Sequence, residues 1–262
     1  MMHAVDIRRF PLETDRVRRL LGAMSARRPS PMPKPWLVLW GPGDPERQRL
    51  MRECVAKGGH AIALDLAYWN RDSYFRVSID APHPQAWVMR RDWPAWRLER
   101  TKPPIADYWD PRGPVIVAGI GAKAHVQYKD HSVLAWEQEQ AARITDGRRV
   151  YYRRKHPSGP YVDGMHPAPQ GHIDTVLRGA SLVITWHSNV AVDALRLGIP
   201  AVCRDGAAAA VCPSEVLPGQ APLGDALRMR FLQNLAWFQW GPHETNEMFI
   251  WAGKMLRGAD DD

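Results

Sequence analysis

The chain has little cysteine, no long apolar run and no acidic excess. Its three cysteines, Cys54, Cys203 and Cys212, show no CxxC spacing, which argues against a disulfide framework or a zinc site and favours a reducing compartment. No apolar run approaches the roughly 20 residues that a membrane-spanning helix needs. The N-terminus carries arginines but lacks the apolar stretch of a secretory signal. We therefore expect a cytoplasmic protein without a membrane partner.

The chain is instead rich in basic residues. Its formal net charge is +7 over 262 residues, with an isoelectric point near 9.5, which favours a polyanionic partner. Residues 1–35 hold eight basic and three acidic side chains, so +5 of the excess lies there. The same arginines also fit the solvated face of a helix predicted near residues 13–24. A hydrophobic content of 45% is enough for a folded core.

Apolar stretches typical of buried strands alternate with helical patterns along the chain. Residues 70–110, rich in Trp, Pro and Arg, show no clear pattern. The alternation predicts strands at 36–40, 60–69, 114–118, 148–155 and 181–186, with a further strand entered through Pro200, and helices at 45–59, 132–144, 170–180, 189–198, 224–240 and 243–256. Strands joined by helices favour parallel α/β sheets, so we predict two Rossmann-like halves, residues 1–110 and 111–262, with the terminal helices packing back.

A glycine turn follows the predicted strand at 114–118. Gly119 and Gly121 lie in the stretch AGIGAKAHVQY, with Lys123 beside them. The dinucleotide fingerprint GxGxxG is incomplete because Ala124 occupies the third glycine position. Glu137 and Glu139, at about the spacing of the ribose-binding acid, fall within a predicted helix. The turn therefore fits backbone contact with a phosphate or an acceptor, or a tight turn without a ligand.

Basic residues gather at the carboxyl end of the predicted strand at 148–155, in the stretch YYRRKHP. Ligands of open α/β sheets lie at this edge of the strands. Because side chains alternate along a strand, Arg153 and Lys155 share one face and form a natural pair for a diphosphate. The alternative is an exposed strand end with solvated basic side chains.

A polar turn follows the apolar strand at 181–186. His187, Ser188 and Asn189 lie at a predicted helix start, where unpaired backbone N–H groups and the helix dipole favour an anion. Ser188 or Asn189 is also an ordinary helix N-cap. Asp193 follows one turn later, about 6 Å along the helix axis from Asn189.

This stretch resembles a known family. TWHSNVAVDALRLGIPAV, residues 185–202, is similar to the nucleotide-sugar-binding half of GT-B-fold glycosyltransferases, and the resemblance extends more loosely over about 112–256. The terminal stretch LAWFQWGPHETNEMFIWAG, residues 235–253, is similar to small phage-encoded glycosyltransferase-like proteins. The resemblance implies two Rossmann-like halves facing a cleft, with the donor in the C-terminal half. It also implies that the polar turn holds the donor diphosphate and that Asp193, where the family usually has Glu, binds the ribose. We expect a UDP-sugar as donor substrate, without a further cofactor.

The resemblance also implies how the reaction runs. A base for the acceptor hydroxyl commonly comes from a strand-end loop of the N-terminal half, and Asp44 and Asp72 are the candidates, although each also fits a helix cap or a turn. The only Asp-x-Asp sequence is the terminal one at 260–262, so we expect no metal site. Arg153, Lys155 and Lys123 would then meet the phosphate charge, with His187 as a further diphosphate or base contact.

The sequence says least about the identity of the acceptor substrate. Aromatic and basic residues interleave at 68–78, and the chain holds 12 Trp, which fits stacking of bases or sugars as well as packing between domains. With the basic charge, this suggests transfer onto modified phage DNA. Two alternatives remain open: a non-catalytic nucleic-acid-binding protein on a GT-B-like scaffold, and a glycosyltransferase of surface polysaccharides. The sequence does not decide between monomer and dimer.

Overall fold

The computed structural model describes residues 36–121, 124, 128, 132–155 and 162–257. The helix predicted near residues 13–24 therefore lies outside the described residues. The chain forms two compact units, one from residues up to 84 together with the segment from 237, the other from residues 85–236. These bounds differ from the predicted division at residue 110: residues 85–110 belong to the second unit, and the C-terminal segment adds a strand and a helix to the first. Within the described residues, no helix is long and apolar enough to cross a bilayer.

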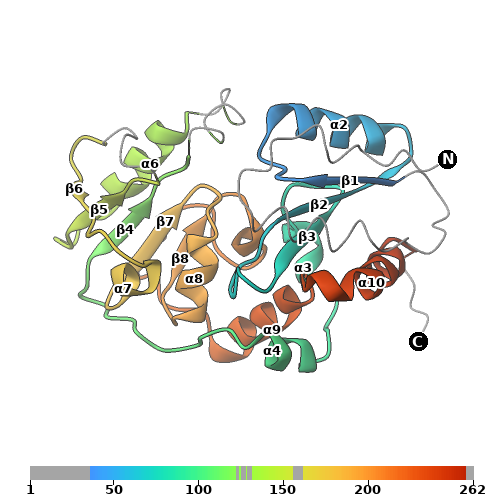
Figure 1. Cartoon of the computed structure of the whole chain (residues 1–262). Helices are drawn as coiled ribbons and strands as arrows, with labels where there is room; N and C mark the ends of the chain where they lie inside the picture. The colour runs from blue at the N-terminus through green and yellow to red at the C-terminus, as the bar shows by residue number, and fades with distance from the viewer. Residues whose placement is uncertain (1–35, 122–123, 125–127, 129–131, 156–161, 258–262) are drawn as a thin grey trace. The chain divides into compact units, whose positions relative to one another are not determined.

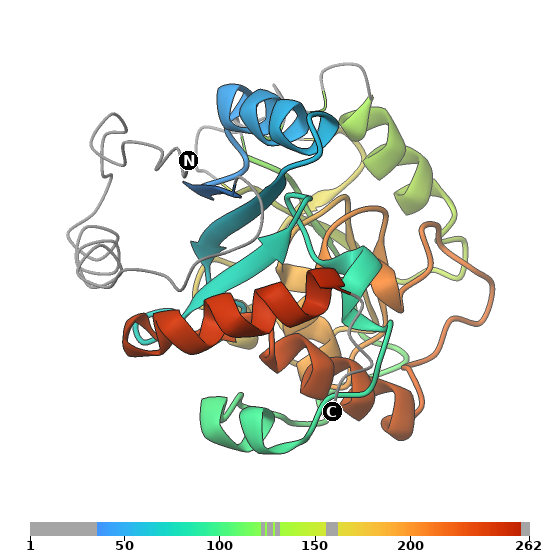
Figure 2. The ribbon, with the colours of Figure 1, turned by 90° about the vertical axis from the view of Figure 1, so that its right-hand side faces the viewer.

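The first unit is built on a four-stranded mixed sheet (Figure 1). Figure 2 shows helices α2 and α10 on opposite sides of strands β1, β2 and β3. The elements are β1 (Trp36–Trp40), α2 (Pro45–Ala56), β2 (His60–Leu66), β3 (Phe75–Ile79), β9 (Gln239–Trp240), η3 (Pro242–Glu244) and α10 (Thr245–Arg257). The predicted strands at 36–40 and 60–69 and the helix at 45–59 are confirmed, with shorter bounds for the last two.

The prediction of a parallel Rossmann-like sheet in this half is wrong beyond its first pair. Strands β1 and β2 are parallel, but β3 pairs with β2, and β9 with β3, in antiparallel register. Strand β3, FRVSI, alternates apolar and polar residues, a pattern that predicts a strand and that was missed in the irregular stretch at 70–110. Strand β9 is only two residues long and has no such pattern. The fold is thus mixed α/β, with one parallel and one mixed sheet.

The second unit carries a parallel five-stranded sheet in the order β6-β5-β4-β7-β8 (Figure 1). Its elements are α3 (Gln85–Val88), α4 (Trp96–Thr101), β4 (Val115–Ala118), α6 (Val133–Ala142), β5 (Val150–Arg153), β6 (His166–Pro167), α7 (Ile173–Leu177), β7 (Leu182–Thr185), α8 (Val190–Arg196), β8 (Ala201–Cys203), η2 (Ala207–Ala210) and α9 (Asp225–Ala236). Every strand and helix predicted between residues 114 and 202 is confirmed, and so are both terminal helices.

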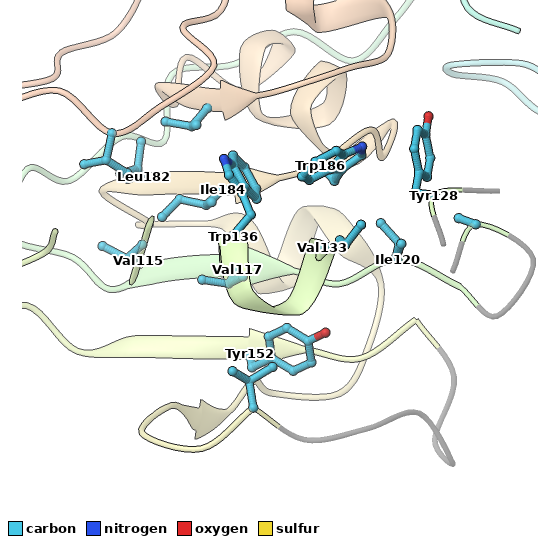
Figure 3. Close-up of a cluster of buried hydrophobic side chains, with 14 residues drawn as sticks. Val115, Val117, Ile120, Tyr128, Val133, Trp136, Tyr152, Leu182, Ile184 and Trp186 are labelled. Atoms are coloured by element: carbon cyan, nitrogen blue, oxygen red, sulfur yellow. The ribbon is translucent and has the colours of Figure 1, made fainter. Parts of the chain in front are cut away.

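A dry core lies between helix α6 and this sheet. Figure 3 shows Val133 and Trp136 of α6 close to Val117 and Ile184 of the central strands. All four side chains are less than 10% exposed. Strands β4 and β7 are buried along their whole lengths, as the apolar runs of a covered parallel sheet require. This packing fixes the carboxyl ends of the central strands, where the candidate site lies.

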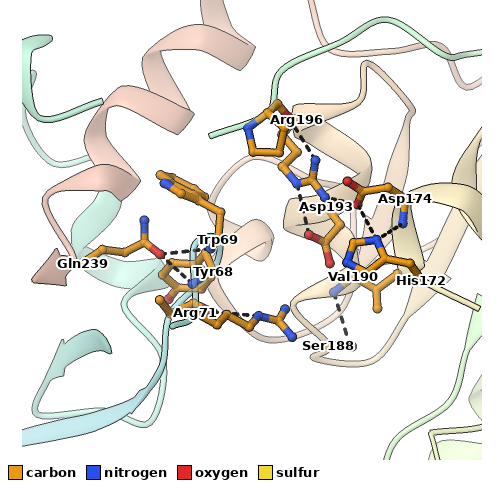
Figure 4. Close-up of polar contacts among 12 residues, drawn as sticks. Tyr68, Trp69, Arg71, His172, Asp174, Ser188, Val190, Asp193, Arg196 and Gln239 are labelled. Carbon is orange, nitrogen blue, oxygen red and sulfur yellow. Dashed lines mark hydrogen bonds and ion pairs between the residues drawn. The ribbon is translucent and has the colours of Figure 1, made fainter. Parts of the chain in front are cut away.

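The C-terminal segment closes the first unit through a buried glutamine. The Gln239 side chain, fully buried in β9, accepts hydrogen bonds from the backbone N–H groups of Tyr68 and Trp69 at 2.6 and 3.1 Å (Figure 4). These two N–H groups follow β2 and have no ladder partner in the sheet register. A side chain more than 160 residues away therefore satisfies the backbone at the end of β2.

Candidate functional site

The candidate site lies at the carboxyl ends of strands β4, β5, β7 and β8, which we call the carboxyl edge of the five-stranded sheet. From β4 the chain first builds β5 and β6 on one side, then returns to build β7 and β8 on the other. The strand order therefore reverses between β4 and β7. Ligands of open α/β sheets bind at such a reversal, outside the carboxyl ends of the strands.

The glycine turn after β4 packs against residues of β5 and of the loop that follows it. The Gly119 N–H donates to the Arg153 carbonyl at 3.1 Å, and an added Cβ at Gly119 would lie 2.2 Å from the Tyr152 hydroxyl. An added Cβ at Gly121 would lie 3.1 Å from Cδ of Lys155. Gly119 is thus required by close packing, and Gly121 lies against the stem of Lys155. Lys123, the third predicted member of this group, lies outside the described residues.

The two basic residues after β5 have different surroundings. Arg153 is half-buried, and its Nη2 donates to the Gly171 carbonyl at 3.2 Å, so it also holds a neighbouring loop. Lys155 is exposed beside Gly121. Of the predicted pair, Lys155 is therefore better placed to meet a phosphate in solution.

The turn after β7 is tied to β4 through a buried hydroxyl. Thr185 donates to the Ala118 carbonyl at 2.8 Å and accepts from the Ser188 N–H at 3.3 Å. The Ser188 hydroxyl in turn accepts from the N–H of Val190 at 3.3 Å, which is the capping role that the sequence left open. Helix α8 has only seven residues, which limits its dipole.

His187 and Asn189 complete this turn. The ring centroid of His187 lies 5.3 Å from that of Tyr128, so the histidine packs against a residue of the loop after β4. Asn189 is the residue before the first turn of α8 and makes no capping hydrogen bond with its side chain. The structure thus places the glycine turn, Lys155 and the turn at 187–189 at the carboxyl ends of β4, β5 and β7, where the strand order reverses.

Asp193 has an interior partner that the sequence did not reveal. Its side chain is 4% exposed, and its Oδ1 lies 3.2 Å from Nε of Arg196. The Arg196 guanidinium also pairs with Asp174 of α7 and donates to the Pro104 carbonyl at 2.9 Å (Figure 4). This ion-pair network gives Asp193 a structural role, while the ribose contact implied by the resemblance stays a prediction.

The carboxyl edge also holds an acid that the sequence reasoning missed. Asp205 follows β8, and its Oδ2 accepts from the Tyr128 hydroxyl at 2.6 Å. Its Oδ1 accepts from Nε2 of Gln85 at 2.8 Å and from the Gly206 N–H at 2.7 Å. An acidic residue directly after a predicted strand is the signal that could have pointed to Asp205.

A buried carboxyl lies behind the glycine turn. Glu137 is fully buried, and its Oε2 accepts from the Tyr152 hydroxyl at 3.1 Å. Burial raises the pKa of Glu137 to about 7, although the Tyr152 hydrogen bond acts in the opposite direction. Burial and the neighbouring Glu137 carboxylate raise the pKa of Tyr152 well above its usual value, so Tyr152 stays protonated and donates.

The candidate bases lie in the first unit. Asp44 caps helix α2, where its Oδ1 accepts from the N–H groups of Glu46 and Arg47 at 3.1 and 3.3 Å. Asp72 is exposed in the turn between β2 and β3. A third acid at the end of β2, Asp65, was missed by the sequence reasoning and pairs with Nη2 of Arg76 at 2.8 Å.

We expect Asp44→Ala to lower the free energy of unfolding by about 1 kcal/mol, because two N–H groups of α2 lose their acceptor. Asp44→Asn keeps an acceptor oxygen, so it should lower the free energy of unfolding by only about 0.3 kcal/mol. Urea unfolding of both variants checks this. Equal losses of stability in the two variants would contradict the capping role.

All three cysteines are free, and burial raises the pKa of Cys203 and brings that of Cys212 to about 12, which keeps these two thiols protonated. No group of three or more His, Cys, Asp or Glu side chains among the described residues is arranged to hold a metal ion.

Comparison with known proteins gives a likeness of fold. No family model matches the chain, and no curated protein matches its sequence. The chain is similar to Thermosulfurimonas dismutans KpsC, β-Kdo 2,7 transferase, with a TM-score of 0.50, 14% identity, and coverage of 91% of this chain and 90% of that one. A second similar structure, Thermosulfurimonas dismutans KpsC, β-Kdo 2,4 transferase, has a TM-score of 0.45, 12% identity and coverage of 77% and 79%. The first likeness shows a GT-B-like fold and gives no support to a phage origin.

Proposed function

We propose that this chain is a glycosyltransferase that moves a sugar from a nucleotide-activated donor to an acceptor hydroxyl of a surface polysaccharide. The observation that carries the proposal is the convergence of the glycine turn, Lys155 and the turn at 187–189 at the reversal of the strand order. The fold supports it, since a chain similar over nine-tenths of its length is described as a β-Kdo transferase. Kdo is therefore the first candidate for the transferred sugar.

The donor would lie along the carboxyl edge. The glycine turn would bring Lys155 to the donor, because the stem of Lys155 lies beside Gly121. Lys155 would neutralise phosphate charge, and Ser188 and Asn189 would flank the same group from β7. In this proposal Arg153 orders the loop at Gly171 as well as adding positive charge.

An acidic polysaccharide acceptor would explain the positive net charge of the chain as well as a DNA acceptor would. Basic surfaces attract any polyanion, and many surface polysaccharides are acidic, so the net charge of +7 does not single out nucleic acid. The likeness to a Kdo transferase favours the polysaccharide. The base would be Asp44, Asp72 or Asp65, each of which lies in the first unit at or after a strand end.

We expect Lys155→Met to weaken donor binding about tenfold, because a charge-assisted hydrogen bond to a phosphate contributes about 1.4 kcal/mol. The donor is first found by thermal shift against UDP-, GDP-, ADP- and CMP-sugars, CMP-Kdo among them, and its dissociation constant is then measured by calorimetry. Arg149→Met is the matched control. Arg149 is also exposed and precedes β5, so it lies at the opposite edge of the sheet. Equal effects of the two variants would refute the donor site.

Once the donor is known, the class of the acceptor is identified by transfer assays. Transfer of radiolabelled sugar onto a Kdo-containing oligosaccharide would support the polysaccharide reading. Transfer onto duplex DNA, with affinity that falls steeply as salt rises, would instead support the DNA acceptor. Salt-sensitive DNA binding without affinity for any nucleotide sugar would favour the non-catalytic alternative.

A further inference from the structure

Glu137 is a buried acid that no part of the proposed reaction uses. It lies on the face of α6 turned to the sheet and is fully buried. One oxygen accepts from Tyr152, and the other, Oε1, has no hydrogen-bond partner within the described residues. A protonated carboxyl tolerates this environment, but an ionised one needs partners for both oxygens. Its ionisation therefore demands a local rearrangement, either movement of the side chain or entry of water.

The Tyr152 hydroxyl connects this acid to the glycine turn. The ring of Tyr152 lies so close to Gly119 that an added Cβ would be 2.2 Å from the hydroxyl oxygen and 2.7 Å from Cζ. Gly119 also bonds through its N–H to the Arg153 carbonyl, one residue after Tyr152. A displacement of the Tyr152 hydroxyl is therefore transmitted to the backbone that would approach the donor phosphate.

Among the described residues, few other titratable groups lie around Glu137. Strands β4 and β7 carry none, and Tyr152 of β5 is the described titratable side chain that faces it from the sheet. Gln140, on the same face of α6, is neutral and accepts from the Val216 N–H at 2.8 Å. The charged residues Glu139, Arg143 and Glu215 are solvent-exposed or partly so, and both glutamates pair with Arg143.

We propose that Glu137 is a positioning residue for donor binding: while neutral it keeps Tyr152 seated against Gly119, and when it ionises the rearrangement that its unpaired oxygen requires displaces Tyr152, so the donor binds less tightly. The inference rests on the donor site proposed above. It makes donor binding decline above neutral pH, because the pKa of Glu137 lies at about 7. The phosphates of a nucleotide sugar are diesters, and they keep their charge throughout this range.

The stability of the protein should follow the same group, without any donor. A pKa of about 7 lies above the usual 4.5, so the protonated acid stabilises the fold fully below about pH 4.5, and this contribution is lost as the pH rises through 7. Glu137→Gln cannot titrate and keeps an acceptor for Tyr152. We expect its melting temperature to fall less than that of the wild type between about pH 5 and about pH 8.

The decisive experiment measures the dissociation constant of the donor at about pH 6 and about pH 8. If only the neutral form is competent, its fraction falls from about 90% to about 10%, so wild-type binding weakens about tenfold. Glu137→Gln should bind equally at both pH values. Other groups that change their charge in this range are shared by the two proteins and cancel in the comparison. If the donor dissociation constants of the wild type and of Glu137→Gln change equally with pH, the inference is wrong, while the proposed function is unaffected.

Tyr152→Phe keeps the test decisive if Glu137→Gln does not fold. This variant removes the hydroxyl that connects the acid to the glycine turn, while Glu137 still titrates. We expect its melting temperature to stay dependent on pH and its donor affinity to become independent of pH. A donor affinity that still falls tenfold would refute the connection. Failure of every nucleotide sugar to bind at both pH values would refute the proposed function, and this inference with it.

Discussion

Arg196→Met is expected to lower the melting temperature by roughly 10 °C, because removing one member of a buried ion pair costs about 3–5 kcal/mol. The Arg196 and Asp193 side chains are each 4% exposed, and Arg196 also pairs with Asp174 and the Pro104 carbonyl. Without the guanidinium, the Asp193 carboxylate is left as a buried charge. Asp174 is less affected, since 27% of its side chain is exposed. Differential scanning fluorimetry measures the change.

Arg143→Met is the matched control for this prediction. Arg143 also pairs with two acids, Glu139 and Glu215, but its side chain is 37% exposed and its partners are more exposed still. Solvent replaces such pairs readily, so we expect no measurable change in melting temperature. Adding Asp193→Leu to Arg196→Met should recover part of the loss, because it removes the stranded charge. Equal effects of the two arginine variants would contradict the buried network.

Gly119→Ala is expected to destabilise the second unit by about 1–3 kcal/mol and to abolish measurable donor binding. The new methyl group would lie 2.2 Å from the Tyr152 hydroxyl, in a core where Tyr152 is held by Glu137 and cannot move away cheaply. The turn must therefore shift, and the backbone that would approach a phosphate shifts with it. Urea unfolding and calorimetric titration with the donor measure the two effects.

Gly121→Ala provides the comparison within the same turn. Its new methyl group would meet Cδ of the exposed Lys155 at 3.1 Å, and a flexible lysine stem moves at little cost. We expect little change in stability from this variant. If Gly121→Ala destabilised the protein as much as Gly119→Ala, the contact with Tyr152 would not be the cause.

Much of the second unit could be predicted from its sequence because its strands are covered on both faces. Uninterrupted apolar runs such as LVIT and VIVA mark central parallel strands, and the polar residues after them mark the carboxyl edge. Gly119, Lys155 and Ser188 could therefore be assigned to one edge before their positions were known. Asp205 lies two residues after β8, whose three-residue apolar run is a weaker signal than those of β4 and β7.

Other features depend on contacts between distant residues that no local pattern encodes. Strand β9 exists because two residues near 240 pair with β3, and the buried Gln239 satisfies backbone after β2. The pairing of Asp193 with Arg196 follows from helix spacing, but its burial against Asp174 and Pro104 does not. The antiparallel pairing of β3 with β2 and β9 could not be predicted either, because it also depends on contacts between distant residues.

The discontinuous course of the first unit has a consequence for synthesis. A ribosome makes all segments of the second unit, residues 85–236, before it makes β9 and α10. The first unit therefore waits for its last strand and helix while its neighbour already has everything needed to fold. During that interval β3 has an unpaired edge and the backbone after β2 lacks Gln239, so a nascent chain is most exposed to aggregation there. The unit that begins first is the one completed last.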